Sequence, residues 1–431
     1  MTVRGRAAEP SRRGGRRRAV KGAALLLPAL LALTACDGAS AGAAGGGADT
    51  KDASGDVVVM TWAPAGTGSD DRPGVTALAA AIGTEVNGKG GLYGRKLRVL
   101  TCNEHGTADG AAACAHQAVD AKAVAVVGAY SQYGDTFMPL LEAAGIPYLG
   151  GYGLSAPEFS SPYSYPVGGG TPSLIAGSGR QLVAAGCRSV AVLRPDSGAG
   201  DTLTRYLSAA LAPDGVALTD IKVGEKNADY ADAVHRAVNG DRSGNCVTDA
   251  LGPEQTLKVL DAWRKAAPHH TQFASVIGSI QQSVVDATGG ANGPLDGAFA
   301  TGWYPPESSP VWDGLRSTAG PDKTITTADL AVQTTWVAYQ VLLQAADRLS
   351  SAGTPFTTRT LRAELDGDDT LADGGVTPPL TWGLTDLLPS AETPRLTDTW
   401  VTFQQVKDGK LTQQQSGFVD VRWALTGGKP S

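Results

Sequence analysis

The chain has 431 residues, with 36 Lys and Arg, 42 Asp and Glu, and five cysteines. This length indicates more than one domain, because single hydrophobic cores seldom grow past about 250 to 300 residues. A composition of 42% hydrophobic and 18% charged residues is that of a globular protein and excludes wholesale disorder. Residues 37–431 hold 28 basic and 41 acidic side chains, a net charge of −13. Because such a body repels phosphate groups, we exclude nucleic acid as a partner.

The N-terminus has the three parts of a secretory signal: a basic stretch ending at Lys21, an apolar run at 22–35, and small residues before Cys36. The run is shorter than the roughly 20 apolar residues of a membrane-spanning helix. Residues 33–36 (Leu-Thr-Ala-Cys) resemble the lipobox of bacterial lipoproteins, in which the cysteine is diacylated and the chain is cleaved just before it. We therefore expect a signal peptide at 1–35 and lipidation at Cys36; a plain signal peptide is the alternative.

The segment after Cys36 is small and polar. Residues 37–55 consist mostly of Gly, Ala, Ser and Asp and cannot bury a core, so we expect 36–55 to be the lipid anchor and a flexible linker. This arrangement predicts a protein held on the extracytoplasmic side of the cell membrane by its lipid alone. The export route, Sec or twin-arginine, stays open, because Arg17 and Arg18 lack the Phe-Leu pair that usually follows.

From Asp56 onward, short apolar runs alternate with amphipathic segments, which predicts βα units and parallel sheets. In the first series we expect strands at 57–60, 97–100, 123–127 and 146–149 and helices at 73–88, 107–120 and 135–144. The second series, after a loop at 162–172, has expected strands at 189–193, 216–223, 246–251 and 273–277 and helices at about 173–186, 200–211, 229–239 and 254–267. The sequence therefore predicts an α/β protein with two lobes, each a doubly wound parallel sheet.

Four cysteines remain if Cys36 carries the lipid, and three pairings are possible among them. Cys102 ends a strand and Cys114 lies in the next helix, a spacing suited to a local disulfide. Cys187 and Cys246 lie at the starts of the first and third strands of the second lobe, which are neighbours in a sheet ordered 2-1-3-4-5. We therefore predict the disulfides Cys102–Cys114 and Cys187–Cys246. Zinc is the competing use, but no closely spaced Cys or His pair is present.

A local repeat joins the two lobes. Residues 123–136 and 189–202 each contain a strand followed by Ser-x-x-Gly-Asp-Thr, which places Ser131 and Ser197 just past a strand's carboxyl end. Ligands of open α/β sheets bind at this edge, where helix N-termini offer free N–H groups. Two such edges that face each other would form a cleft; the alternative is that each serine only starts a helix.

These features together resemble the branched-chain amino-acid-binding proteins of ABC importers, which have the type I periplasmic-binding-protein fold. The resemblance covers most of residues 56–425 and rests on the motifs at 87–97, 143–147, 156–158, 251–256 and 379–382. It implies two lobes joined by a three-crossover hinge, with the helix at 328–349 in the first lobe. The implied boundaries are 56–171 and 298–384 for lobe 1, and 172–297 and 385–431 for lobe 2.

The resemblance also implies a ligand site. Family members hold an amino acid's carboxylate with loops after the third and fourth strands, which here carry Ser131, Gln132, Tyr133, Tyr152, Gly153 and Ser155. Ser197 replaces the usual aromatic residue of the second lobe, and Gln281 stands in the stretch that normally supplies an acidic residue for the ligand's ammonium group. Asp196, Asp249 or Glu254 are candidates for the missing charge, with pairing to a helix N-terminus as the alternative. Trp62 is a candidate stacking wall or else a packing residue.

Enzyme motifs are absent from the sequence: it has no Gly-x-Ser-x-Gly elbow, Walker loop or His-Glu-x-x-His. The glycines at 198–200 are a weak match to a dinucleotide fingerprint, and the acidic stretch at 366–373 lacks the order of a calcium loop. We expect no catalytic residue, cofactor or metal. The leading hypothesis is a monomeric, lipid-anchored solute-binding protein that delivers a small polar ligand to ABC permease subunits; the alternative is a sensor of the same fold that signals without transport.

Overall fold

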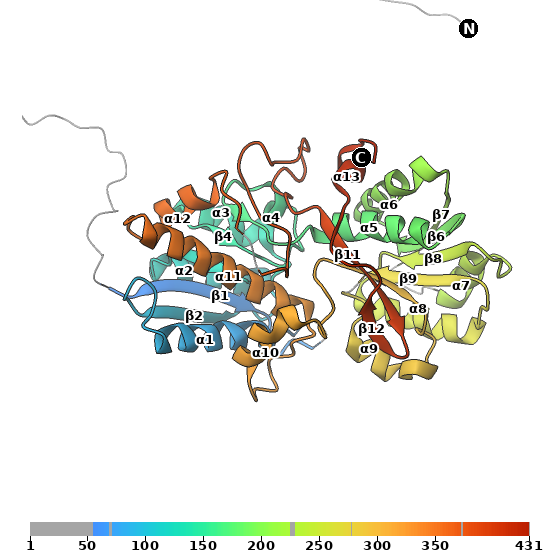
Figure 1. Cartoon of the computed structure of the whole chain (residues 1–431), viewed down its shortest axis with the longest axis horizontal. Coiled ribbons are helices and arrows are strands. Elements are labelled where there is room, and N and C mark those ends of the chain that lie inside the picture. Colours follow the sequence, from blue (N-terminus) through green and yellow to red (C-terminus); the bar gives the residue numbers. More distant parts are fainter. Residues whose placement is uncertain (1–54, 69–70, 225–228, 277, 372–373, 431) are drawn as a thin grey trace, which may run out of the picture. The chain divides into compact units, whose positions relative to one another are not determined.

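A computed structural model describes residues 55–68, 71–224, 229–276, 278–371 and 374–430 of the chain (Figure 1). The predicted signal peptide (1–35), Cys36 and the predicted linker up to residue 54 lie outside these residues. None of the helices in the described part is long and apolar enough to cross a bilayer.

The first lobe is built on a parallel sheet whose described strands lie in the order β2-β1-β3-β4-β5. The strands are β1 (Val57–Ala63), β2 (Leu97–Asn103), β3 (Ala125–Val127), β4 (Tyr148–Leu149) and β5 (Ser164–Tyr165). The helices between them are α1 (Pro73–Gly88), α2 (Ala108–Asp120), α3 (Gly134–Ala144) and α4 (Pro157–Ser160). The predicted alternation is confirmed, and the strands have the same 2-1-3-4-5 order that was expected for the second lobe; β5 and α4 are too short to have produced a periodic signal.

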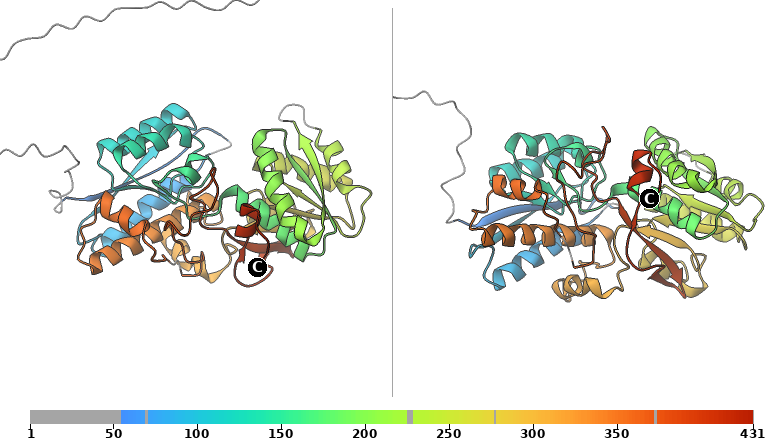
Figure 2. Two further views of the ribbon diagram at one scale, coloured as in Figure 1. Left: turned by 90° about the horizontal axis from the view of Figure 1, so that it is seen from above. Right: turned by 45° about the horizontal axis from the view of Figure 1, so that its top comes forward.

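Strand β1 explains why helices cover both faces of this sheet (Figures 1 and 2). Its side chains alternate, because successive residues of a strand point to opposite faces. Val57 and Val59 are fully buried in the cluster that includes α1 and the later helix α11 (Leu330–Ser351), whereas Met60 and Trp62 are buried in the cluster with α2 and α3. A strand that is apolar at nearly every position must be covered on both faces, as in other parallel sheets.

The second lobe repeats this plan and adds antiparallel strands. The order is β12-β11-β10-β9-β8-β6-β7, and β13 pairs with β11. Its elements in chain order are α5 (Gly170–Ala184), β6 (Ser189–Pro195), α6 (Gly198–Leu211), β7 (Ala217–Val223), α7 (Tyr230–Val238), β8 (Asn245–Asp249), α8 (Pro253–Ala266), β9 (Gln272–Val276), α9 (Gln282–Ala287), β10 (Phe299–Gly302), β11 (Trp400–Lys407), β12 (Lys410–Gln413), β13 (Val419–Asp420) and α13 (Arg422–Thr426). The sequence predicted β6 to β9 and the intervening helices but not the C-terminal strands.

The chain passes between the two sheets three times. It leaves the first sheet after β5 and the second after β10, and it returns to the second at β11. Between β10 and β11 lie α10 (Asp313–Ala319), α11 (Leu330–Ser351) and α12 (Thr358–Leu365), of which α10 and α11 pack against α1 of the first lobe. Strand β10 falls inside the range predicted for lobe 1, but it pairs with β9 and β11. By its pairing, β10 belongs to the second sheet; the other predicted lobe boundaries stay predictions.

Both predicted disulfides are present. Cys102, on β2, is bonded to Cys114, on α2, with the Cα atoms 5.7 Å apart. Cys187 is bonded to Cys246 on β8, with the Cα atoms 5.9 Å apart. The second bond joins the starts of two adjacent strands, because β6 and β8 are paired in register from Ser189 and Asn245.

The two bonds close loops of different length, with sequence separations of 12 and 59. Because the entropy removed from the unfolded chain grows with loop length, we predict that C187S/C246S lowers the free energy of unfolding by about 4 kcal/mol and C102S/C114S by about 3 kcal/mol. Urea unfolding of the oxidised protein and both double variants measures this. Equal stability of all three proteins would contradict the pairing as a stabilising feature.

Candidate ligand-binding site

The loops after the first-sheet strands meet at one edge, because parallel strands all end on the same side. These loops enclose a pocket of about 160 Å³, which we call the first-lobe pocket. Its walls come from the loops after β1, β2 and β3, and its lining residues are Pro64, Thr67, Glu104, Gly106, Tyr130, Gln132 and Tyr133. Gln132 and Tyr133 are the predicted site residues among them.

Glu104 is the buried acid of this pocket. Its side chain is only 1% exposed, and in the described part of the chain its Oε2 atom has no hydrogen-bond partner. Burial raises the pKa of Glu104 to about 7; a hydrogen bond from Ser131 acts in the opposite direction, and the charge of Glu158 adds to the increase. A carboxyl group with this pKa changes its charge near neutral pH.

Ser131 is buried, and its hydroxyl group is engaged within the protein. The Tyr133 backbone N–H donates to its Oγ atom over 3.1 Å, and the Ser131 hydroxyl forms a hydrogen bond with the Glu104 carboxyl group. Tyr133 in turn donates its phenolic hydrogen to the Gly106 carbonyl, which ties the loop after β3 to the loop after β2. Ser131 thus positions two residues that line the pocket, Tyr133 and Glu104, and Gln132 is exposed at the pocket's rim.

Tyr152, in the loop after β4, links the two lobes. Its ring centroid lies 4.9 Å from that of Tyr130 and 5.5 Å from that of Trp303, which follows β10 of the second sheet. A Cβ atom added at Gly278, just past β9, would lie 3.5 Å from the Tyr152 hydroxyl oxygen. Burial raises the pKa of Tyr152 well above its usual value, so the phenol is neutral and available as a hydrogen-bond donor.

The loop that carries Tyr152 is held by one carboxyl group. Glu158, on α4, is 1% exposed and accepts hydrogen bonds from the backbone N–H groups of Gly153, Leu154 and Ser155 at 2.9 to 3.0 Å. The Ser155 hydroxyl donates to the same carboxyl over 2.8 Å. Gly153 has a φ of +81°, and a Cβ atom there would clash with the Phe159 ring, so this turn requires glycine.

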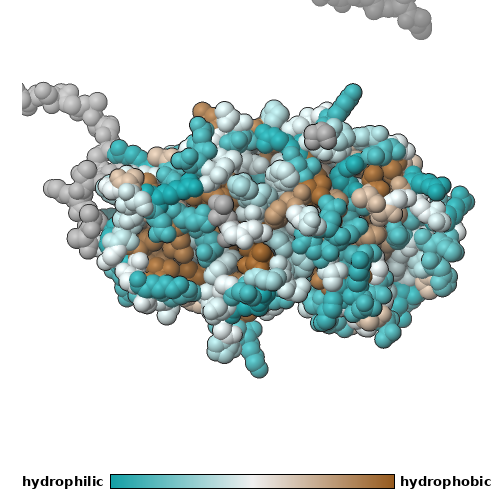
Figure 3. Space-filling model, viewed as in Figure 1, coloured by the Kyte–Doolittle hydropathy of each residue, from teal (hydrophilic) through white to brown (hydrophobic). Residues whose placement is uncertain are grey.

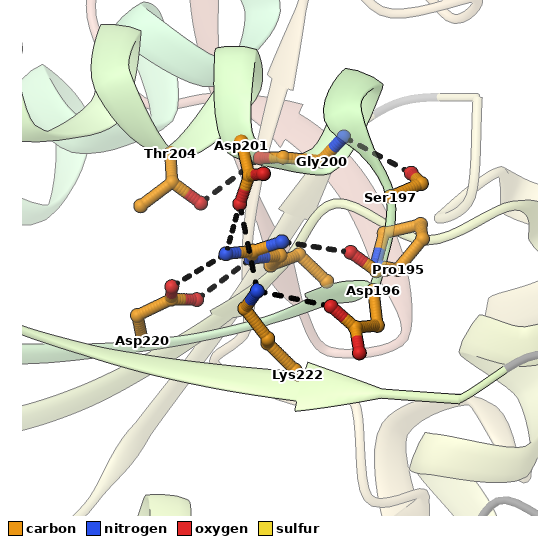
Figure 4. A network of polar contacts seen from close by, with 9 residues as sticks. Pro195, Asp196, Ser197, Gly200, Asp201, Thr204, Asp220 and Lys222 are labelled. Atoms are coloured by element: carbon orange, nitrogen blue, oxygen red, sulfur yellow. Dashed lines mark hydrogen bonds and ion pairs between the residues drawn. The ribbon is translucent and has the colours of Figure 1, made fainter. Parts of the chain in front are cut away.

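In the second lobe, the carboxyl ends of β6 and β7 carry a network of paired charges (Figure 4). The Arg194 guanidinium is buried and donates to both carboxylate oxygens of Asp220 at 2.8 and 2.6 Å, and it lies 2.6 Å from Asp201. Asp196 is exposed and forms an ion pair with Lys222 over 2.9 Å. The charge of Asp196 is therefore already balanced within its own lobe.

Ser197 serves as a helix cap. Its Oγ atom accepts from the Gly200 backbone N–H over 3.3 Å, at the start of α6. Ser131 differs, because α3 begins three residues after it, at Gly134, and Tyr133 occupies the cap position. The two serines of the sequence repeat therefore have different local roles, and the interpretation of Ser197 as a helix-starting residue fits the structure.

Gln281 lies beside a second pocket, of about 370 Å³, which we call the hinge pocket. Its walls come from the loops after β9 and β10, the start of α11 and strands β11 and β12, and they include Gln281, Gln282, Tyr304, Gln333 and Gln404. The Gln281 side chain donates only a long hydrogen bond, of 3.4 Å, to the Gly278 carbonyl. The amide of Gln281 is therefore close to Gly278 and to the contact with Tyr152.

Three other candidates lie elsewhere. Trp62 is 0% exposed and packs on Phe137 and Tyr148 beneath the sheet edge, so the expectation of a stacking wall is not met. Glu254 is exposed on α8 and forms an ion pair with Lys258 over 2.9 Å, in a groove between α7 and α8. Asp249 is fully buried at the end of β8 and accepts a hydrogen bond from Ser275; burial raises its pKa to about 6.

Sequence analysis missed the residues that give this region its chemistry. Glu104, Tyr130 and Trp303 each lie just past the carboxyl end of a strand, which was the available signal. For Glu104 the flanking Asn103 and His105 made the position look like an ordinary polar turn. Trp303 could not be placed, because nothing in its surroundings showed that β10 joins the second sheet.

The fold, with two lobes built on parallel sheets, is that of a class of two-lobed binding proteins. A sequence profile of the family described as periplasmic binding protein matches residues 59–408, and the chain belongs to this family. No curated protein matches the chain by sequence.

Solved structures show the same type I fold. An extracellular ligand-binding receptor from Verminephrobacter eiseniae is 18% identical, with a TM-score of 0.67 over 83% of this chain and 99% of that chain. A solute-binding protein of an ABC transporter from Rhodopseudomonas palustris, in complex with 3,4-dihydroxybenzoic acid, is 15% identical, with a TM-score of 0.66 over 85% and 98%. A leucine-binding protein from Thermotoga maritima is 15% identical, with a TM-score of 0.60 over 84% and 99%.

Removal of the Glu158 carboxyl should leave three buried or half-buried N–H groups without their acceptor. We predict that E158A lowers the free energy of unfolding by about 2 to 4 kcal/mol, because a lost acceptor costs about 1 to 3 kcal/mol and more when it is charged. Chemical denaturation measures this. E142A, which removes a half-buried glutamate of α3, is the control and should change stability by less than about 0.5 kcal/mol. Similar losses in both variants would contradict the assigned role of Glu158.

The raised pKa of Glu104 makes stability depend on pH. In the unfolded chain Glu104 loses its proton near the usual pKa of 4.5, whereas in the folded protein it keeps the proton up to about pH 7. The folded state therefore binds more protons between these pH values, and the free energy of unfolding falls as the pH rises through them. We predict that E104Q abolishes this decrease and is more stable than the wild type at pH 8 by about 3 kcal/mol. Denaturation at pH 4, 6 and 8 measures it, with the exposed D109N as control. A parallel profile for E104Q and wild type would show that Glu104 titrates normally.

Proposed function

We propose that the protein is the solute-binding component of an ABC importer and captures a small polar ligand, an amino acid or a related compound, between its two lobes. The contact of Tyr152 with Trp303 and Gly278 carries this proposal. A solute placed beside the Tyr152 ring would touch loops of both sheets. Family membership supports the same role, because periplasmic binding proteins are extracytoplasmic binding components of transport systems.

Ligand capture follows from population shift. A solute that contacts both lobes at once interacts more favourably with the closed arrangement, so it shifts the equilibrium towards closure. The proposed contacts are the residues of the loops after β3 and β4 together with the second-lobe loop at Gln281. They comprise Gln132, Tyr133, Tyr152, Gly153 and Ser155 from the first lobe, and Gln281 from the second; Ser131 is buried and would act by positioning Tyr133 and Glu104.

The ligands of similar proteins narrow the choice of solutes. One relative was solved with 3,4-dihydroxybenzoic acid, and another is a leucine-binding protein. 3,4-Dihydroxybenzoic acid and leucine are both small molecules with a carboxylate and an apolar body. Tyr130, which lines the first-lobe pocket, and the half-buried Tyr152 beside it provide aromatic surface for such a body. In amino-acid-binding members of the family, an acidic residue of the second lobe contacts the ammonium group of the ligand. This protein has Gln281 in that stretch of the chain.

We further propose that the mature chain begins at Cys36 and is held by its lipid on the outer face of the membrane, as a monomer. The linker up to residue 55 would give the folded body the freedom to meet permease subunits. A sensor of the same fold would use the same closure to signal to a partner. Growth on the identified solute distinguishes the two, because only an importer makes growth depend on this protein.

Closure should be visible in solution. In a thermal-shift screen of amino acids, aromatic acids, amides and amines, a true ligand at 100 times its Kd stabilises the folded state by about 2.7 kcal/mol. We predict that this ligand also decreases the radius of gyration measured by small-angle X-ray scattering.

The matched test places a large side chain between the lobes. G278F should weaken binding of this ligand at least tenfold, because the new ring meets Tyr152, whereas G88F, at a position with open space around it, should bind normally. Unchanged affinity in G278F would contradict a site between the lobes.

A further inference from the structure

Glu104 is the only side chain with a titratable carboxyl among the residues that line the first-lobe pocket in the described chain. The side chain is more than nine-tenths buried, and its Oε2 atom has no hydrogen-bond partner among the described residues. A buried carboxyl group that keeps an unpartnered oxygen lowers stability unless something else pairs with it. Glu158, equally buried, accepts four hydrogen bonds. Asp249 and Asp398 each have an oxygen that is likewise unpartnered within the described chain, but Glu104 is the one of these three acids that lines the pocket at the carboxyl ends of the first-sheet strands.

The same pocket is poorly suited to a carboxylate. The Ser131 hydroxyl already accepts from Tyr133 and bonds Glu104, so it has little capacity left to hold a ligand oxygen. An ionised Glu104 beside it would also repel a negative group. The first lobe of this protein therefore differs in charge from a site that holds the carboxylate of an amino acid at this position.

We propose that the first-lobe pocket binds the cationic nitrogen of the solute, an ammonium or guanidinium group, with Glu104 as its counter-ion. This inference rests on the proposed function and assigns the ligand to the class of small amines. Glu104 then supplies, from the first lobe, the acid that the second lobe lacks at Gln281. The ligand's remaining part extends towards Tyr130, whose ring lines the pocket and lies against Tyr152.

Size and surroundings agree with a cation. A pocket of about 160 Å³ is smaller than the 300 to 1,000 Å³ typical for whole ligands, so it holds a head group rather than an entire solute. The Tyr133 ring lines the same pocket, and aromatic rings attract cations; the Tyr130 ring already has the Arg72 guanidinium 5.0 Å from its centroid. The net charge of −13 over residues 37–431 also raises the concentration of cations near the surface.

The probes are ethanolamine, putrescine and agmatine as cations, ethylene glycol and 1,4-butanediol as neutral analogues, and succinate and benzoate as carboxylates. We expect at least one cation to raise the melting temperature of the wild-type protein and to bind in calorimetry at pH 8. E104Q should weaken this binding at least tenfold, E104D should restore part of it, and the surface control D109N should leave it unchanged.

A second measurement needs no variant that could misfold. Between pH 6 and pH 8 the affinity of the wild-type protein for the cationic probe should rise about tenfold, because a carboxyl with a pKa of about 7 ionises over this range while the amine stays charged. Glu158 and Tyr148 are the other titratable groups whose charges act on Glu104 or respond to it, and His105 is its neighbour in sequence. The affinity of E104Q should not change over this range, which separates Glu104 from these groups.

The outcomes separate the two proposals. If a carboxylate or neutral probe binds and E104Q leaves its affinity unchanged, the pocket is not a cation site, although the solute-binding function stands. If cations bind with equal affinity to wild type and E104Q, Glu104 is not the counter-ion. If no probe of any class binds, both the cation site and the proposed solute-binding function are contradicted.

Discussion

Burial of the parallel strands on both faces is the constraint on which the rest of this structure depends. Val57 and Val59 face one layer of helices and Met60 and Trp62 the other, so the faces of the sheet are closed to any ligand. Only the strand ends remain accessible, and the polar groups of the site must lie on the loops that follow them. Glu104, Ser131 and Tyr152 follow β2, β3 and β4 for this reason, and Trp303 follows β10.

Acidic side chains at these ends are held in two ways. At the ends of β6 and β7, Arg194 pairs with Asp201 and Asp220, and Lys222 pairs with Asp196, so each of these three carboxylates has a cation within its own lobe (Figure 4). The buried acids Glu104, after β2, and Asp249, at the end of β8, are instead hydrogen-bonded by hydroxyl groups, and each keeps one oxygen without a hydrogen-bond partner among the described residues. On the face in Figure 3, hydrophobic residues form separate areas among hydrophilic ones.

Local patterns predicted most of the fold. Apolar runs between amphipathic helices predicted the strands β1 to β4 and β6 to β9. The cysteine positions relative to these strands then allowed both disulfides to be paired correctly. Strand β11 could not be predicted, because its pairing with β10 joins residues about 100 positions apart, and β12 and β13 pair with β11 in turn. The site was harder still. Ser197 matches Ser131 in sequence but caps a helix, and the burial of Trp62 and Glu104 depends on the packing of several loops.

The disulfide Cys102–Cys114 has a consequence for where the site acquires its shape. Cys102 lies two residues before Glu104, and its partner is on α2, so the bond holds both ends of the turn that carries the acid. In a reducing compartment this turn has no covalent support. An exported protein of this design would complete its pocket only after it has crossed the membrane, and newly made chains would not sequester the solute inside the cell.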